Sequence, residues 1–105
     1  MNGCAQITIT EPAKRDLEDG YGFYEAQLAG LGDYFLSSLQ SDIDSLIVFA
    51  GVHAKPYRSE VYRSLSRIFP YAVFYRMKGN TAQVLAVLDT RRDPQLTLQR
   101  LKASP

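Results

Sequence analysis

Three strand-like runs follow one another in residues 62–89, YRSLSRIFPYAVFYRMKGNTAQVLAVLD. They are rich in Val, Ile, Leu, Tyr and Phe and cover Tyr62–Ile68, Tyr71–Met77 and Thr81–Asp89. Phe69-Pro70 separates the first run from the second because proline has no N–H to donate to a ladder. Lys78-Gly79-Asn80 suits a tight hairpin, since Gly and Asn accept positive φ. The segment therefore predicts an antiparallel meander.

The residues before the meander predict a strand and two helices. Gln6–Thr10 alternates polar and apolar side chains, and Thr10 can cap a helix over Glu11–Leu28 that begins with a tolerated proline. A glycine-containing turn follows, and a second apolar stripe then repeats at helical spacing through Leu31, Phe35, Leu39, Ile43 and Leu46. Because the turn is short, the two helices should form an antiparallel hairpin.

The C-terminal residues predict one more short helix. Asp93-Pro94 resembles an N-cap and first turn, and Leu96, Leu98 and Leu101 follow it, with fraying expected over Ala103–Pro105. A chain of 105 residues has room for one core, so residues 1–105 should form a single domain. The predicted fold class is α+β: the helical hairpin packs on one face of a mainly antiparallel four-stranded sheet, giving two layers.

Composition and charge narrow the function classes. Hydrophobic residues make up 46% of the chain, which excludes a disordered tail, and the single cysteine cannot close an internal disulfide. The sequence shows no signal peptide and no apolar run of membrane-spanning length, so the expected location is the cytoplasm. Residues 1–50 carry two basic and eight acidic side chains, whereas residues 51–105 carry ten basic and three acidic ones. This asymmetry predicts a basic face that meets nucleic acid or an acidic protein.

Few residues in the sequence are candidates for a catalytic or metal-binding role. The only histidine, His53, falls in a predicted loop without metal-ligand neighbours, so we expect an exposed residue, no metal site and no cofactor. The arginines on or beside the meander are better candidates, because arginine beside tyrosine binds phosphates and bases or forms a protein hot spot. They are Arg58, Arg63, Arg67, Arg76, Arg91 and Arg92. Phe23 and Tyr34 point away from the helical stripes and indicate either surface aromatics or a partner-binding face.

The order of these segments resembles the RelE/ParE family of bacterial toxins from type II toxin-antitoxin modules, and in particular its ParE, or plasmid-stabilisation, branch. The resemblance spans about Ile7 to Arg100 and is most specific in RIFPYAVFYR, residues 67–76, and VLAVLDTRRDP, residues 84–94. It implies a toxin that arrests growth and that a cognate antitoxin holds inactive in a hetero-oligomer. The antitoxin's partly disordered segment would fold along the toxin surface.

Departures from the family pattern favour target binding over RNA cleavage. The RNA-cutting branch tends to carry arginine where this chain has Ala72, and an acid–base pair where it has Thr90 and Arg91. Cleavage needs groups that accept and donate protons, and these residues supply none. We therefore expect no catalytic residues and inhibition of DNA gyrase by binding. The expected target contacts are Arg67, Arg76, Arg91 and Arg92, and the expected antitoxin contacts are Phe23 and Tyr34.

Two alternatives stay open. One is a ribosome-dependent messenger-RNA endoribonuclease that uses Arg67 and Arg76 to stabilise phosphorane charge. The other is a non-toxic family member that retains only antitoxin binding. Asp89 stands where ParE-like sequences often have histidine, and we expect it to pair with Arg91 or Arg76 rather than to act as a base.

Overall fold

The computed structural model describes residues 2–57 and 59–103, so Arg58 and the predicted fraying of Ser104 and Pro105 lie outside the described residues. The elements run in the order β1 (Gln6–Ile9), α1 (Glu11–Gln27), α2 (Leu31–Asp44), α3 (Leu46–Phe49), β2 (Tyr62–Leu65), β3 (Tyr71–Lys78), β4 (Thr81–Asp89) and α4 (Pro94–Lys102). No helix among these residues is long and apolar enough to cross a bilayer.

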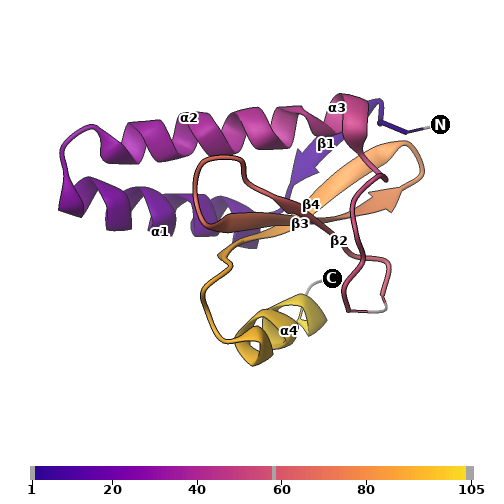
Figure 1. Ribbon diagram of the computed structural model, residues 1–105. Helices are drawn as coiled ribbons and strands as arrows, with labels where there is room; N and C mark the ends of the chain where they lie inside the picture. Colours follow the sequence, from indigo (N-terminus) through magenta and orange to yellow (C-terminus); the bar gives the residue numbers. More distant parts are fainter. Residues whose placement is uncertain (1, 58, 104–105) are drawn as a thin grey trace.

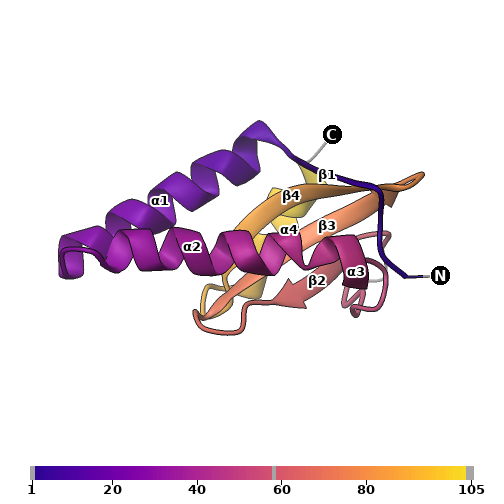
Figure 2. The ribbon, with the colours of Figure 1, turned by 90° about the horizontal axis from the view of Figure 1, so that it is seen from above.

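The four strands form one mixed sheet in the order β1-β4-β3-β2 (Figures 1 and 2). β2, β3 and β4 form the predicted antiparallel meander, and β1 adds to β4 in parallel. Gly79 and Asn80 form the β3–β4 turn, with Gly79 at a φ of 60°. The left-handed backbone at this position is the reason for a glycine there. The expected α+β architecture is confirmed.

The helical hairpin of α1 and α2 covers one face of the sheet (Figure 1). Thr10 starts α1 as predicted: its Oγ accepts the Ala13 N–H, and it donates to the Val84 carbonyl at 3.0 Å. Gly20 allows the two helices to approach closely, because a Cβ at this position would lie 2.4 Å from Cζ of the buried Phe35. Glycine in a helix interior costs about 1 kcal/mol relative to alanine, and the contact with Phe35 is the packing reason for it here.

The C-terminal helix α4 lies on the opposite face of the sheet (Figure 1). It covers a second, smaller apolar cluster of Ala72, Phe74, Ala86 and Leu88, to which Tyr57, Val61 and Leu101 add partial cover. The predicted two-layer arrangement was therefore incomplete, because α4 adds cover on the second face of the sheet. Strand residues alternate between faces, so the meander supplies both clusters, and α4 shields the outer one from water.

The largest deviation from the predicted elements lies at β2, which ends at Leu65 rather than at Ile68. Ser66 closes the turn to β3 with its N–H on the Tyr71 carbonyl, and its hydroxyl donates to Asp42 at 2.6 Å. The bond to Asp42 holds Ser66 against α2 just after the β2–β3 pairing has ended at Leu65. The predicted second helix is also divided in two. It is interrupted at Ser45, so that α2 ends at Asp44 and α3 follows as a separate turn.

Candidate functional site

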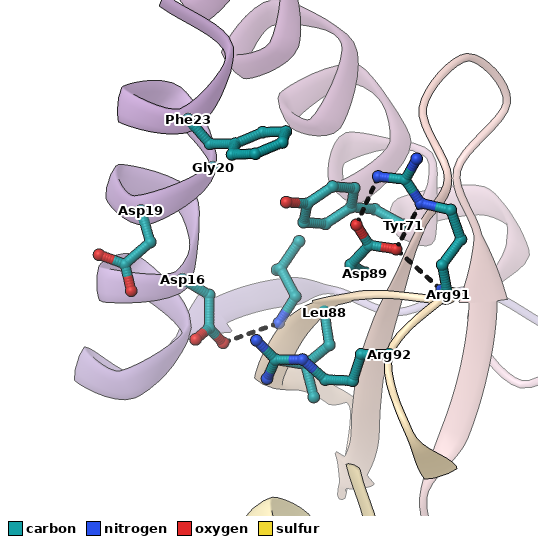
Figure 3. A pocket seen from close by; sticks show the side chains of 10 residues that line it. Asp16, Asp19, Gly20, Phe23, Tyr71, Leu88, Asp89, Arg91 and Arg92 are labelled. Carbon is teal, nitrogen blue, oxygen red and sulfur yellow. Dashed lines mark hydrogen bonds and ion pairs between the residues drawn. The ribbon is translucent and has the colours of Figure 1, made fainter. Parts of the chain in front are cut away.

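A groove of 480 Å³ lies between α1 and the end of β4 (Figure 3). Helix α1 forms one wall and the ends of β3 and β4 form the other, with lining residues Asp16, Asp19, Gly20, Phe23, Tyr71, Val87, Leu88, Asp89, Arg91 and Arg92. The groove exists because β1 pairs with β4 only from Thr81 to Val84. Beyond Val84 the outer edge of β4 faces a helix instead of a strand.

Asp16 ties three elements together at the floor of this groove. Its carboxylate accepts the backbone N–H of Val87 at 2.9 Å, which belongs to the part of β4 beyond the pairing with β1. It also accepts both terminal nitrogens of Arg100 from α4, each at 2.7 Å. Because backbone N–H groups away from water need a partner, Asp16 replaces the missing strand. One side chain thus fixes α1, β4 and α4 relative to one another.

Asp89 and Arg91 form a charged pair at the rim of the groove, as predicted for Asp89 (Figure 3). Arg91 donates from Nε at 3.0 Å, from Nη2 at 2.7 Å and from its backbone N–H at 2.8 Å. The side-chain hydrogen bonds from Arg91 hold the pKa of the Asp89 carboxyl below its ordinary value, and the same bonds raise the pKa of Arg91. Burial raises the pKa of Tyr71 beside them. The pKa values of Asp89 and Tyr71 are therefore both shifted away from neutral pH.

Comparisons with known proteins agree with the fold. The family model described as "ParE toxin of type II toxin-antitoxin system, parDE" matches residues 7–94. The chain belongs to the ParE toxin family. The fold also matches a solved chain of the chromosomal ParDE TA system from P. aeruginosa, with a TM-score of 0.69, 21% sequence identity, and coverage of 78% of this chain and 91% of that chain. No curated protein sequence matches the chain.

The four arginines predicted as target contacts occupy three places on this ParE-family toxin. Arg91 and Arg92 share the groove. Arg67 lies on the β2–β3 connection, where its Nε donates to the buried Asp42 at 3.2 Å and its Nη2 donates to Ser41. Arg76 lies in β3 and donates to Gln83 of β4 at 2.8 Å. The fold therefore brings Arg91 and Arg92 together and leaves the other two on separate surfaces.

The two aromatic residues predicted as antitoxin contacts are both half exposed. Phe23 is 53% exposed, lines the groove and packs edge-on against Tyr24 at 5.0 Å. Tyr34 is 51% exposed and packs against Phe69 at 5.4 Å. Both rings extend a core cluster of aromatic residues to the surface. Such rings are held in place by the core while one face stays available to a partner.

His53 is not the exposed loop residue that the sequence suggested. It is partly buried, and its Nδ1 is hydrogen-bonded to the hydroxyl of Tyr75, which also accepts the Gly51 N–H. Burial lowers the pKa of His53. These bonds fasten the 51–56 loop to the sheet. Within residues 2–57 and 59–103, no group of three or more His, Cys, Asp or Glu side chains could hold a metal ion.

Sequence reasoning missed Asp16 and Arg100 as partners, and it gave Asp42 no role. The two members of the first pair are 84 residues apart, and Asp42 meets Arg67 across 25 residues. No local signal connects such distant positions. The sequence does place Asp16 on the same helical face as Gly20 and Phe23, at spacings of four and three, which is a pattern that could have outlined one wall of the groove.

Proposed function

We propose that this ParE-family toxin arrests bacterial growth in the cytoplasm by binding DNA gyrase, and that a cognate antitoxin neutralises it in a hetero-oligomer. The observation that carries the proposal is the groove of Figure 3, where Arg91 and Arg92 lie on the same wall and the half-exposed Phe23 faces them from α1. Arginine and aromatic side chains are the residue types that dominate protein hot spots.

Binding is favoured over RNA cleavage by the directions in which the pKa values of Asp89 and Tyr71 are shifted. Proton transfer at neutral pH needs an acid and a base with pKa values near 7. In the groove the pKa of Asp89 is lowered by its bonds to Arg91, and burial raises the pKa of Tyr71. His53 bonds to Tyr75 in the 51–56 loop and is not among the groove residues. Arg67 and Arg76, the charge-stabilising pair that cleavage would need, lie on different surfaces.

The deciding experiment expresses the chain from a tight promoter, with and without the adjacent antitoxin gene. Plasmid supercoiling and messenger-RNA integrity are then measured in the same culture after induction. Loss of supercoiling with intact messages supports the proposal, whereas cut messages with normal topology identify an endoribonuclease. Normal growth with the antitoxin still bound identifies a binding module without toxicity.

A pair of charge-reversed variants tests the arginine surface. Arg91→Glu with Arg92→Glu should abolish the supercoiling defect, because both cations of the groove become anions. Lys14→Glu with Arg15→Glu makes the same change of charge on exposed positions of α1 and should leave toxicity intact. Arg92→Glu alone serves as a second variant that keeps the Asp89–Arg91 pair. Full toxicity in the Arg91/Arg92 variants would remove the groove from the proposal.

The proposed antitoxin contacts are tested by measuring affinity for the purified antitoxin. Phe23→Ala and Tyr34→Ala should each weaken binding about tenfold or more, as truncation of an interface aromatic typically does. Leu96→Ala on α4 is the matched control, since Leu96 is equally exposed but lies on the other side of the sheet. Equal affinity for all three variants would show that the antitoxin binds elsewhere.

A further inference from the structure

A second, smaller hollow of 120 Å³ lies on the far side of the sheet, between the face of the sheet and the start of α4. The loop before β2 and strands β2, β3 and β4 form its floor, while Pro94 and Thr97 contribute the α4 side. Arg63 of β2 and Arg92 both line it. Arg63 stands opposite Phe74 in the β2–β3 register and therefore projects from the face that α4 covers.

These two arginines line the hollow, and in the described structure no ion pair or hydrogen bond joins either side chain to a carboxylate. Among the described residues, neither the Arg63 nor the Arg92 side chain makes a hydrogen bond or an ion pair. Two guanidinium groups are always charged, and like charges facing one hollow raise its energy. An anion between them would relieve this repulsion and accept their forked N–H donors.

The nearby acidic side chains are already engaged. Asp89 also borders the hollow, but its carboxylate receives both Nε and Nη2 of Arg91. Asp93, at the start of α4, accepts the N–H of Gln95 as the helix cap at 2.9 Å. Neither carboxylate bonds to Arg63 or Arg92 in the described structure, so the hollow keeps a positive character.

The size and lining of the hollow indicate which anion fits. A volume of 120 Å³ has room for a carboxylate with its methylene groups. Phe74 and Leu88 give it an apolar floor, and the ring of Tyr57 stacks on Phe74. A phosphate group carries no methylene groups of its own that could pack on this apolar floor.

We propose that this hollow is a binding site for the carboxylate of one glutamate or aspartate side chain on a protein partner. Arg63 and Arg92 would hold the carboxylate oxygens, and the apolar floor would take the methylene groups of the same side chain. The hollow shares Leu88, Asp89 and Arg92 with the groove of Figure 3, and Arg63 distinguishes the two. The site does not depend on gyrase being the target. It would anchor an extended acidic segment that passes over the outer face of the sheet.

The test titrates the full-length chain with N-acetyl-glutamate methylamide while the arginine Nε–H and backbone N–H signals are followed by NMR. We expect saturable shifts at Arg63, Arg92 and Thr97. The neutral glutamine analogue should produce none. Arg63→Gln and Arg92→Gln should each weaken binding about tenfold, the usual effect of losing a charge-assisted hydrogen bond. Arg15→Gln, which removes an exposed cation from α1, should leave it unchanged.

Arg92 is exposed, so its variant keeps the test decisive even where Arg63→Gln fails to fold. Equal shifts at all exposed arginines, or unchanged affinity in Arg92→Gln, would overturn the proposal. Parallel titrations use inorganic phosphate and a short single-stranded oligonucleotide. Tighter binding of either one at the same signals would also overturn it, because the hollow would then be a phosphate site.

Discussion

Replacing Asp16 with alanine should destabilise the toxin more than replacing an exposed acidic residue of α1. The substitution leaves the Val87 N–H without its acceptor and removes the two bonds that Arg100 donates to Asp16. An unsatisfied backbone donor costs about 1–3 kcal/mol and a lost charge-assisted bond about 1.5–3 kcal/mol, while alanine returns about 0.5 kcal/mol of helix propensity. The two ionic side chains are only 10% and 26% exposed, so solvent screens them weakly. The expected loss is about 3 kcal/mol of unfolding free energy.

The assay is urea unfolding followed by circular dichroism, together with thermal melts. For a chain of this length, about 3 kcal/mol corresponds to a decrease of about 12 °C in Tm. Asp19→Ala is the matched control, because it makes the same change one turn along α1 at an exposed position. Asp16→Asn should fall between the two, since its amide oxygen can still accept the Val87 N–H. A Tm for Asp16→Ala within 2 °C of Asp19→Ala would refute the role assigned to this carboxylate.

Two further predictions follow from the same contacts. Gly20→Ala should lower the free energy of unfolding by about 2 kcal/mol, because its new Cβ is overpacked against Phe35. Gly22→Ala, which has nothing within 4 Å of its new Cβ, should raise it by about 0.5–1 kcal/mol. Urea unfolding compares the two variants directly, and equal effects would disprove the close approach at Gly20. NMR titration should give Asp89 a pKa below its ordinary value of 3.8, and Arg91→Gln should bring this pKa back up. The stabilisation from the pair should be complete above the ordinary pKa and should disappear as the pH falls through the lower folded pKa. An unchanged pKa of Asp89 in Arg91→Gln would contradict the pairing.

The sequence alone determined the order of the main elements, though not the separate α3 or the end of β2, because periodicity, caps and turns act over a few residues. Thr10 and Asp93 cap α1 and α4 as predicted, and Thr81–Asp89 is β4 with the predicted limits. The Asp89–Arg91 pair was also predictable, since its members are two residues apart. The resemblance to the ParE branch rests on the same local segments, and the family match confirms it.

Only the tertiary structure decided which distant side chains meet. The parallel pairing of the short β1 leaves the edge of β4 to Asp16, and the packing of α4 on the outer face brings Arg100 to the same carboxylate. Strand register puts Arg63 on the face where Arg92 also lies. The bonds of Asp16 join residues 71 and 84 positions apart, and they depend on how whole elements pack rather than on the preferences of neighbouring residues.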